Sequence, residues 1–198
     1  MTLYCATGNP GKLREFQLAA GGVEIAILPG LRDLPAFLET GDTFEENAVA
    51  KALYYAPHAP GRLFADDSGL EVEALGGAPG VRSARFAGGD EANRRALLAS
   101  LRGVDDRHAR FVCAIALAER DHLIARFHGA VEGLIAAEPR GTQGFGYDPL
   151  FYYPPFGCTF AEVSASRKFA VSHRGQALRA MLAFLREGCH GEVAPTRP

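Results

Sequence analysis

The feature that most restricts the fold of this chain is a pair of short apolar runs that lead directly into polar loops. Residues 3–6 are apolar and continue into Thr7-Gly8-Asn9-Pro10-Gly11-Lys12, after which residues 13–20 have the pattern of a helix. Residues 62–65 form a second run, which leads into Asp66-Asp67-Ser68-Gly69. Open α/β sheets bind ligands in loops at the ends of their strands. The sequence therefore predicts an α/β fold with a ligand site in these loops.

The remaining elements follow in a mixed order. Thr43 and Glu46 have the spacing of a capping box, which predicts a helix that ends near Tyr55. Two long strands, residues 110–119 and 122–131, are expected to form an antiparallel hairpin that turns at Arg120-Asp121. The other expected elements are a strand over 23–28, a loop over 29–41, a helix over 91–101 capped by Asp90, a short aromatic strand over 150–153 and a last helix over 175–186. This order indicates a mixed α/β protein.

The composition fits a globular protein and excludes several classes. Of 198 residues, 47% are hydrophobic and 22% are charged, unlike the composition of a disordered chain. The formal net charge of −2 gives no general attraction to nucleic acid or to anionic membranes. No apolar run approaches the ~18 residues of a membrane span, and residues 1–5 lack the basic region of a signal peptide. We therefore expect no nucleic-acid partner, no membrane association and a cytoplasmic location.

The cysteines point to a reduced protein. Cys5, Cys113, Cys158 and Cys189 are far apart and include no CxxC pair, whereas disulfide frameworks occur in short, cysteine-dense chains. Cys5 and Cys113 lie in apolar runs, where cysteine acts as a small core residue. The spacing of Cys and His does not fit a zinc site.

The loop Thr7–Lys12 stands between a predicted strand and a predicted helix. Backbone N–H groups at a helix start attract anions, and Lys12 adds a cation that can reach a phosphate. The loop is neither a Walker A loop nor a GxGxxG loop. On local grounds a plain turn is an equal alternative.

Two adjacent aspartates, Asp66 and Asp67, give a stronger signal. Successive side chains on a strand point in opposite directions, so we expect one carboxylate to face the cleft and the other to be buried or hydrogen-bonded. A carboxylate beside phosphate-binding loops is a natural Mg²⁺ ligand. The alternative is an Asx turn with Gly69 at a positive φ. Because Glu46 is used by the helix cap, Glu39 is the acid free to be a second metal ligand, or else a solvated loop acid.

Two further segments carry candidate binding residues. Gly144-Phe145-Gly146-Tyr147-Asp148 places an aromatic ring that can stack on a base beside an acid that can accept from a base N–H. The alternative is a pair of core aromatics at a tight turn. Basic residues precede the last helix, where the helix dipole disfavours them, so they require an anion or a carboxylate partner. These basic residues are Arg167, Lys168, His173 and Arg174.

These segments together supply a phosphate cradle, metal carboxylates and an aromatic base pocket, which fits a nucleoside triphosphate with Mg²⁺. The residues alone do not identify the base or the bond that breaks. Six motifs in this order are similar to those of the inosine/xanthosine triphosphate pyrophosphatases, over residues 6–185. The motifs are Ala6–Lys12, Thr43–Ala48, Ala65–Leu70, Leu75–Val81 with Ser83–Arg85, Gly144–Pro149 and Ser172–Gly175.

The resemblance implies an elongated mixed β-sheet flanked by helices, with two lobes around a central nucleotide-binding cleft, in a protein that is usually a homodimer. It implies one such pyrophosphatase domain over residues 1–190. The Gly and Pro residues at the end of the chain separately predict a frayed tail over 191–198. The implied activity is the Mg²⁺-dependent hydrolysis of ITP, dITP and XTP to the monophosphate and pyrophosphate, which removes noncanonical purine nucleotides from the nucleotide pool.

The resemblance also implies roles for individual residues. Asp67 would be the catalytic acid/base and a metal ligand, with Glu39 as the second metal ligand and Lys12 as the cation that meets the charge of the leaving pyrophosphate. The implied substrate-binding residues are Thr7, Gly8, Asn9, Pro10, Gly11, Lys12, Ser68, Phe145, Gly146, Tyr147, Asp148, Lys168, His173 and Arg174. The chain departs from the family before Lys168, where Ser164-Ala165-Ser166-Arg167 replaces residues that are usually acidic.

Two other functions compete with this interpretation. One is a pyrophosphatase of the Maf type, which acts on pyrimidine or methylated nucleotides and has a similar architecture; Asp66-Asp67-Ser68-Gly69-Leu70 and Ser172-His173-Arg174-Gly175 argue against it. The other is a nucleotide sensor without catalysis, which the retained carboxylates and Lys12 argue against.

Overall fold

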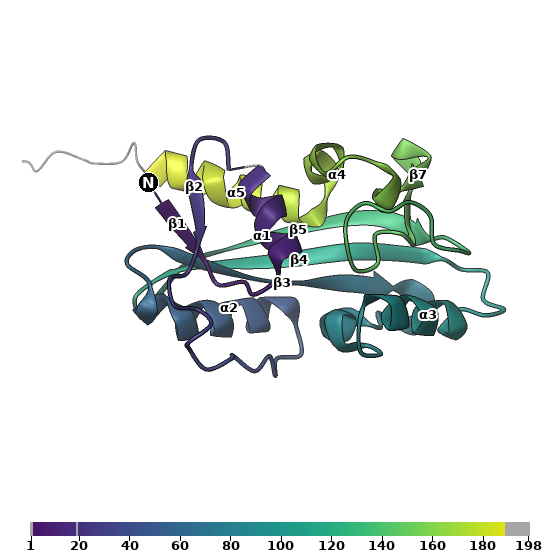
Figure 1. The fold of residues 1–198 in the computed structure, drawn as a ribbon, viewed down its shortest axis with the longest axis horizontal. Coiled ribbons are helices and arrows are strands. Elements are labelled where there is room, and N and C mark those ends of the chain that lie inside the picture. Colours follow the sequence, from purple (N-terminus) through teal and green to yellow (C-terminus); the bar gives the residue numbers. More distant parts are fainter. Residues whose placement is uncertain (1, 19, 189–198) are drawn as a thin grey trace, which may run out of the picture.

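A computed structural model describes residues 2–18 and 20–188, and these residues form a seven-stranded sheet with helices on both faces (Figure 1). The order of strands across the sheet is β2-β1-β3-β4-β5-β6-β7. The strands are β1 (Thr2–Cys5), β2 (Glu24–Ile27), β3 (Leu63–Val72), β4 (His108–Glu119), β5 (His122–Ile135), β6 (Phe151–Tyr153) and β7 (Cys158–Thr159). β2, β1 and β3 run parallel, whereas β3 to β7 are antiparallel. The predicted mixed α/β class is confirmed.

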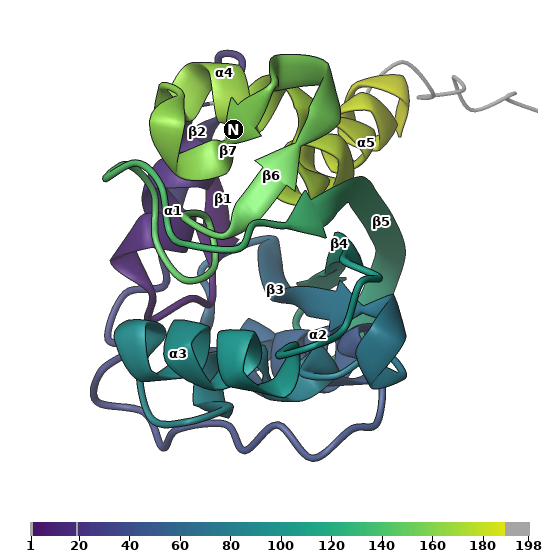
Figure 2. The same ribbon diagram turned by 90° about the vertical axis from the view of Figure 1, so that its right-hand side faces the viewer.

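The helices are divided between the two faces of the sheet. In both ribbon views, α1, α4 and α5 lie on one face, and α2 and α3 lie on the other (Figures 1 and 2). The α-helices are α1 (Pro10–Leu18), α2 (Phe44–Tyr55), α3 (Asp90–Ser100), α4 (Ala165–Val171) and α5 (His173–Gly188). The 3₁₀ helices are η1 (Ala56–His58), η2 (Glu73–Leu75), η3 (Gly80–Arg85), η4 (Pro154–Phe156) and η5 (Phe160–Glu162).

Local sequence explains several of these elements. The predicted capping box of α2 is confirmed: Thr43 Oγ1 accepts from the Glu46 N–H at 3.1 Å, and the Glu46 carboxylate accepts from the Thr43 N–H. The predicted hairpin is confirmed as β4 and β5, with Arg120 in the left-handed region at a φ of 55°. α5 buries a helical stripe against the sheet, formed by Ala177, Leu178, Met181, Leu182 and Leu185.

Several boundaries differ from the sequence prediction; β5, for example, continues past the predicted residue 131 to Ile135. β3 does not end at residue 65 but continues to Val72, because it pairs with β4 in unbroken register along its whole length. Asp90 is not the N-cap of α3: Gly89 occupies that position, and Asp90 is the first residue of the helix. α5 begins at His173 rather than at residue 175, and the short helix α4 before it was not expected. The predicted tail over 191–198 and Cys189 lie outside the described residues.

One edge of β3 loses its strand partner after the first two residues of the strand. β1 pairs with β3 only at Leu63 and Phe64, and the main chain then leaves the sheet after Ala6 donates to the Phe64 carbonyl. From Asp66 to Ser68, the part of the chain that the structure describes places no strand on that edge. β3 stays in the sheet there because it pairs with β4 along its other edge. The sheet therefore presents polar residues of β3 at an opening.

Cys5 and Cys113 are fully buried and unpaired, as expected for core residues. Within the described residues, no helix has the length and apolar character needed to cross a membrane.

Gly129 of β5 lies directly under the start of α5, and its replacement tests that contact. A Cβ there would overlap the His173 carbonyl oxygen and come within 2.8 Å of the Ala177 nitrogen, both of which are main-chain atoms. We expect Gly129→Ala to lower the free energy of unfolding by about 2 kcal/mol, because the helix must move off the sheet. Urea unfolding measures this.

The matched control is Gly61→Ala, where the nearest atom to an added Cβ is a Tyr4 ring carbon at 3.9 Å. Equal stabilities of the two variants would contradict the close approach of α5 to β5.

Candidate active site

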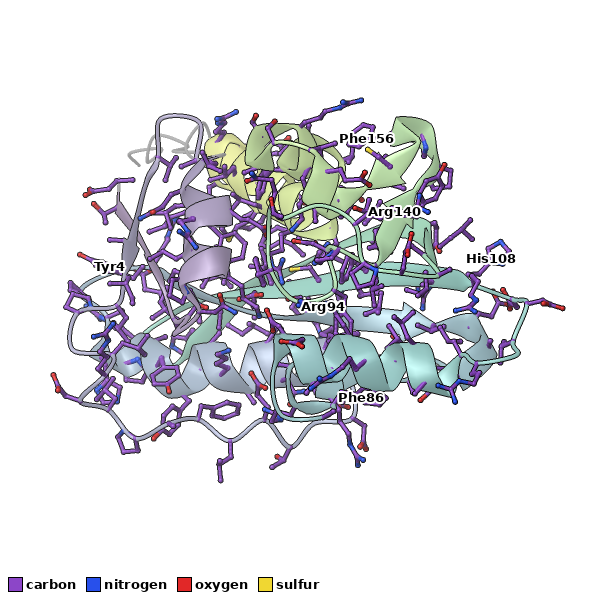
Figure 3. The ribbon with its side chains drawn as sticks, turned by 45° about the vertical axis from the view of Figure 1, so that its right-hand side comes forward. Tyr4, Phe86, Arg94, His108, Arg140 and Phe156 are labelled. Atoms are coloured by element: carbon purple, nitrogen blue, oxygen red, sulfur yellow. The ribbon has the colours of Figure 1, made fainter. Side chains whose placement is uncertain are left out.

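The opening beside β3 leads into a cavity of about 250 Å³. Its wall combines the loop after β1, the middle of β3, η3, the start of α3 and the loop before β6. Figure 3 shows that side chains fill the space between the two layers of helices. The lining residues are Thr7, Gly8, Asn9, Lys12, Glu39, Lys51, Asp67, Ser68, Gly69, Val81, Ser83, Ala84, Asp90, Asn93, Phe111, Phe145, Gly146, Tyr147, Asp148 and Arg174.

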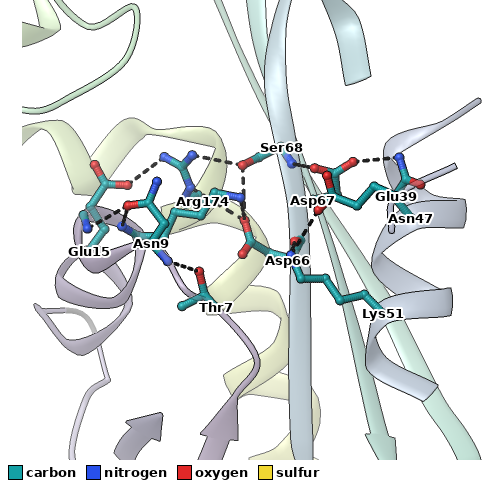
Figure 4. Close-up of polar contacts among 12 residues, drawn as sticks. Thr7, Asn9, Glu15, Glu39, Asn47, Lys51, Asp66, Asp67, Ser68 and Arg174 are labelled. Carbon is teal, nitrogen blue, oxygen red and sulfur yellow. Dashed lines mark hydrogen bonds and ion pairs between the residues drawn. The ribbon is translucent and has the colours of Figure 1, made fainter. Parts of the chain in front are cut away.

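Asp66 and Asp67 point to opposite sides of β3, as the alternation of a strand requires (Figure 4). Asp67 lines the cavity, where its carboxylate accepts from Asn47 Nδ2 at 3.0 Å and from the Ser68 N–H at 2.9 Å. Asp66 is completely buried and forms an ion pair with Lys12 Nζ at 2.8 Å. One carboxylate therefore faces the cavity while the other is a buried partner of a cation.

The two carboxyl groups have opposite pKa shifts. Burial raises the pKa of Asp67 to about 6, helped by the negative charge of Glu39 and opposed by Lys12 and the Asn47 hydrogen bond. Burial also acts on Asp66, but the cations Lys12, Arg174 and Lys51 outweigh it and lower its pKa. Asp66 is thus held ionised, whereas Asp67 can exchange a proton near neutral pH.

The loop Thr7–Lys12 wraps around the start of α1. Asn9 Oδ1 accepts from the N–H groups of Gly11 at 2.8 Å and Lys12 at 3.2 Å, while Thr7 Oγ1 accepts from the Asn9 N–H at 3.2 Å. Of the six predicted residues in this loop, four line the cavity, but Pro10 and Gly11 do not. Gly11 instead packs against the Phe145 ring, which a Cβ would meet at 2.7 Å.

Glu39 lines the cavity on the side of Asp67 (Figure 4). Its carboxylate forms ion pairs with Lys51 Nζ at 3.2 Å and Arg85 Nη1 at 2.9 Å. Burial raises its pKa, but these two cations outweigh that effect and the pKa is lowered. The carboxylate oxygens of Asp67 and Glu39 are hard ligands that fit Mg²⁺, and both have lone pairs beyond those used by protein donors.

Asn47 and Lys51 are site residues that the sequence analysis did not identify. They are four residues apart on α2, and therefore lie on one face of the helix, toward β3. Lys51 Nζ also donates to the Asp66 carbonyl at 3.3 Å. The signal that could have found them was this spacing of a polar and a charged residue within an otherwise apolar helix face.

The loop with Phe145 is fixed by its own polar groups. Asp148 is 2% exposed, and its Oδ2 accepts from the Phe145 N–H at 2.9 Å and from Lys168 Nζ at 2.5 Å. The Tyr147 hydroxyl donates to the Ser83 carbonyl at 2.9 Å. The Phe145 ring lies 5.1 Å from Lys168 Nζ and 5.0 Å from Arg174 Cζ. The carboxylate of Asp148 thus holds the loop in place.

Lys168 and Arg174 share a buried acid that was not anticipated. Glu15 of α1 accepts from Lys168 Nζ at 2.6 Å and from Arg174 Nη1 at 2.8 Å. Arg174 Nη2 also donates to Ser68 Oγ at 2.9 Å. The expected carboxylate partners of the basic residues are therefore Glu15, Asp66 and Asp148. The sequence did offer a signal for Glu15: it is an acidic residue next to apolar Phe16 in the predicted helix.

Lys168 and His173 lie behind the cavity wall rather than on it, unlike Arg174. His173 is 1% exposed and stacks on Phe111, with ring centroids 4.8 Å apart. Neither of its ring nitrogens has a hydrogen-bond partner among the described residues. Burial lowers the pKa of His173 far below its usual value, and the nearby Arg174 and Lys168 lower it further. The ring is therefore neutral.

Known proteins are similar to this chain in sequence and in fold. The chain is 50% identical to a dITP/XTP pyrophosphatase of Acidobacterium capsulatum, with 93% of this chain and 98% of that protein covered. The structure of the Staphylococcus aureus Ham1 protein superimposes with a TM-score of 0.84 at 40% identity, covering 95% of this chain and 100% of that chain. A HAM1 protein from Coxiella burnetii gives a TM-score of 0.84 at 42% identity, covering 94% and 99%.

The sequence profile of the Ham1 family matches residues 3–184, which include every element that lines the cavity. The chain belongs to the Ham1 family.

Proposed function

We propose that this protein is a nucleoside triphosphate pyrophosphatase that hydrolyses dITP, XTP and ITP to the monophosphate and pyrophosphate. Two relatives named dITP/XTP pyrophosphatase support this reaction. Each is 50% identical to this chain, over 93% and 90% of its length. The observation that carries the proposal is the position of Asp67. It stands on the cavity wall with a raised pKa, beside a second acid and within the field of Lys12.

The triphosphate would lie along the loop after β1. Thr7, Gly8, Asn9 and Lys12 line that part of the cavity, and Lys12 supplies a positive charge that is held in place by Asp66. Because Asp66 stays ionised, its ion pair with Lys12 holds the Lys12 ammonium group at the cavity edge. Lys12 can then stabilise the negative charge that develops on the leaving pyrophosphate.

Asp67 and Glu39 would hold Mg²⁺, which when bound neutralises phosphate charge. Asp67 orients the attacking water and accepts its proton at the carboxylate. In the metal-free site the pKa of Asp67 is about 6, so the carboxylate is ionised at neutral pH and can accept a proton. Asn47 fixes the carboxylate from behind by donating to Oδ2.

The purine base would lie at the Phe145 end of the cavity. The aromatic ring offers a stacking face, and Arg174 lines the same cavity with a guanidinium group that only donates hydrogen bonds. A 6-keto group accepts such a bond, whereas the 6-amino group of adenine donates. Adenine would therefore leave a buried donor unpaired, which disfavours ATP.

A substrate panel tests this function. Pyrophosphate release is measured with Mg²⁺ from ITP, XTP, GTP, ATP and dTTP, for the wild type and Asp67→Asn. We expect preferential turnover of ITP and XTP, and a loss of at least about 100-fold in kcat for the variant, because a general base is removed. Asp121→Asn, at an exposed turn 78% accessible, is the control and should retain full activity.

The panel also separates the alternatives. A preference for dTTP would favour the Maf-type function instead. Retained ITP binding without turnover of any nucleotide would favour a sensor. The homodimer, the cytoplasmic location and the division into two lobes stay predictions.

The ionisation of Asp67 gives a separate prediction about the metal. In protein treated with EDTA, we expect the Asp67 carboxyl to titrate with a pKa of about 6, because burial and the charge of Glu39 disfavour the anion. Adding Mg²⁺ should lower that pKa, because a bound cation favours the anion. Carboxyl ¹³C NMR, assigned with Asp67→Asn, measures both values. An unchanged pKa at saturating Mg²⁺ would argue against Asp67 as a ligand.

A further inference from the structure

Gly146 is held by two side chains of α3. Its backbone N–H donates to Asp90 Oδ2 at 2.7 Å, and its carbonyl accepts from Arg94 Nη1 at 2.8 Å. Arg94 is labelled in Figure 3. Gly146 itself adopts a left-handed conformation, with a φ of 61°. Both polar groups of one loop residue are thus bound by charged side chains from an element more than fifty positions earlier in the sequence.

α3 is built to present these two side chains together. Asp90 and Arg94 are four residues apart, so they project from the same face of the helix. Between them, Asn93 is buried and fastens the helix to η3 by donating to the carbonyls of Ser83 and Ala84, both at 3.2 Å. The same Ser83 carbonyl accepts from the Tyr147 hydroxyl. α3 and η3 are therefore fastened to each other, and together they bind the loop at two consecutive residues, Gly146 and Tyr147.

Gly146 directly follows Phe145, whose ring lies at the proposed base end of the cavity. Asp90, Phe145 and Gly146 all line the cavity, whereas Arg94 does not and reaches the loop from behind. On its other side, Phe145 packs on Gly11 and on the Lys168 and Arg174 cations. The position of the Phe145 ring is consequently set by α3 through Gly146 and, on its other side, by Gly11, Lys168 and Arg174.

We propose that Asp90 and Arg94 are positioning residues that clamp Gly146 and so fix the Phe145 ring at the spacing required to bind a purine base. This inference rests on the proposed function and assigns the control of base affinity to α3. The clamp acts on base binding and leaves the triphosphate end of the cavity unaffected. Its loss weakens substrate binding, which appears in KM, and leaves the chemical step, which appears in kcat, nearly unchanged.

The test compares Arg94→Ala and Asp90→Ala with Arg95→Ala in the full-length protein with Mg²⁺. Arg95 is the matched control, because it lies on the same helix, is 74% exposed and pairs only with exposed Glu91 among the described residues. We expect the two clamp variants to raise KM for XTP about tenfold, the effect of losing a charge-assisted hydrogen bond, with kcat within about twofold. Asp90→Asn keeps an acceptor oxygen and should recover most of the affinity.

Inorganic tripolyphosphate, a competitive probe without a base, separates positioning from general damage. Its inhibition constant should be unchanged in the clamp variants. An unchanged KM in Arg94→Ala, or an equal loss of affinity for XTP and tripolyphosphate, would overturn the clamp.

Failure of the proposed function gives a different result. If the wild type hydrolyses neither ITP nor XTP, the proposed function fails, and the clamp is judged by amide hydrogen exchange at residues 145–147. Faster exchange in Arg94→Ala than in Arg95→Ala supports the clamp, and equal exchange overturns it.

Discussion

The change of partner along β3 is the constraint on which the site depends. Antiparallel pairing with β4 runs along the whole strand, whereas parallel pairing with β1 ends at Phe64. The next residues are therefore held rigidly by one edge and are open on the other. Because side chains alternate on a strand, Asp66 turns toward α1 and α5, and Asp67 turns toward α2. One short stretch of strand thus supplies both a buried anchor, Asp66, and a carboxylate that lines the cavity, Asp67.

Charge balance stabilises the interior around this strand. Lys12, Lys168 and Arg174 are largely buried cations, and each has a carboxylate partner within 2.8 Å. Removing one partner from such a pair leaves an uncompensated buried charge, which costs several kcal/mol. Glu15 connects α1 to both α4 and α5 through Lys168 and Arg174. The same ion pairs that hold these helices together therefore also direct positive charge toward the cavity.

The two ends of the cavity are supported by different elements. At the triphosphate end, the loop after β1 is held by Asn9 and by the Lys12–Asp66 pair. At the base end, the loop with Phe145 is held by α3 on one side and by Lys168 on the other. The contacts that fix the base end are therefore different from those that fix the triphosphate end.

The sequence by itself determined the mixed α/β class, the capped helix, the long hairpin and most of the cavity wall, because these follow from local patterns and short motifs. It did not determine that β3 runs through Asp66 and Asp67, since strand length depends on the register with β4. Nor did it identify Glu15, Asn47 or Lys51, or separate Arg174 on the wall from Lys168 and His173 behind it. Only the tertiary structure decided those points, because burial and charge pairing arise from packing between segments far apart in the chain.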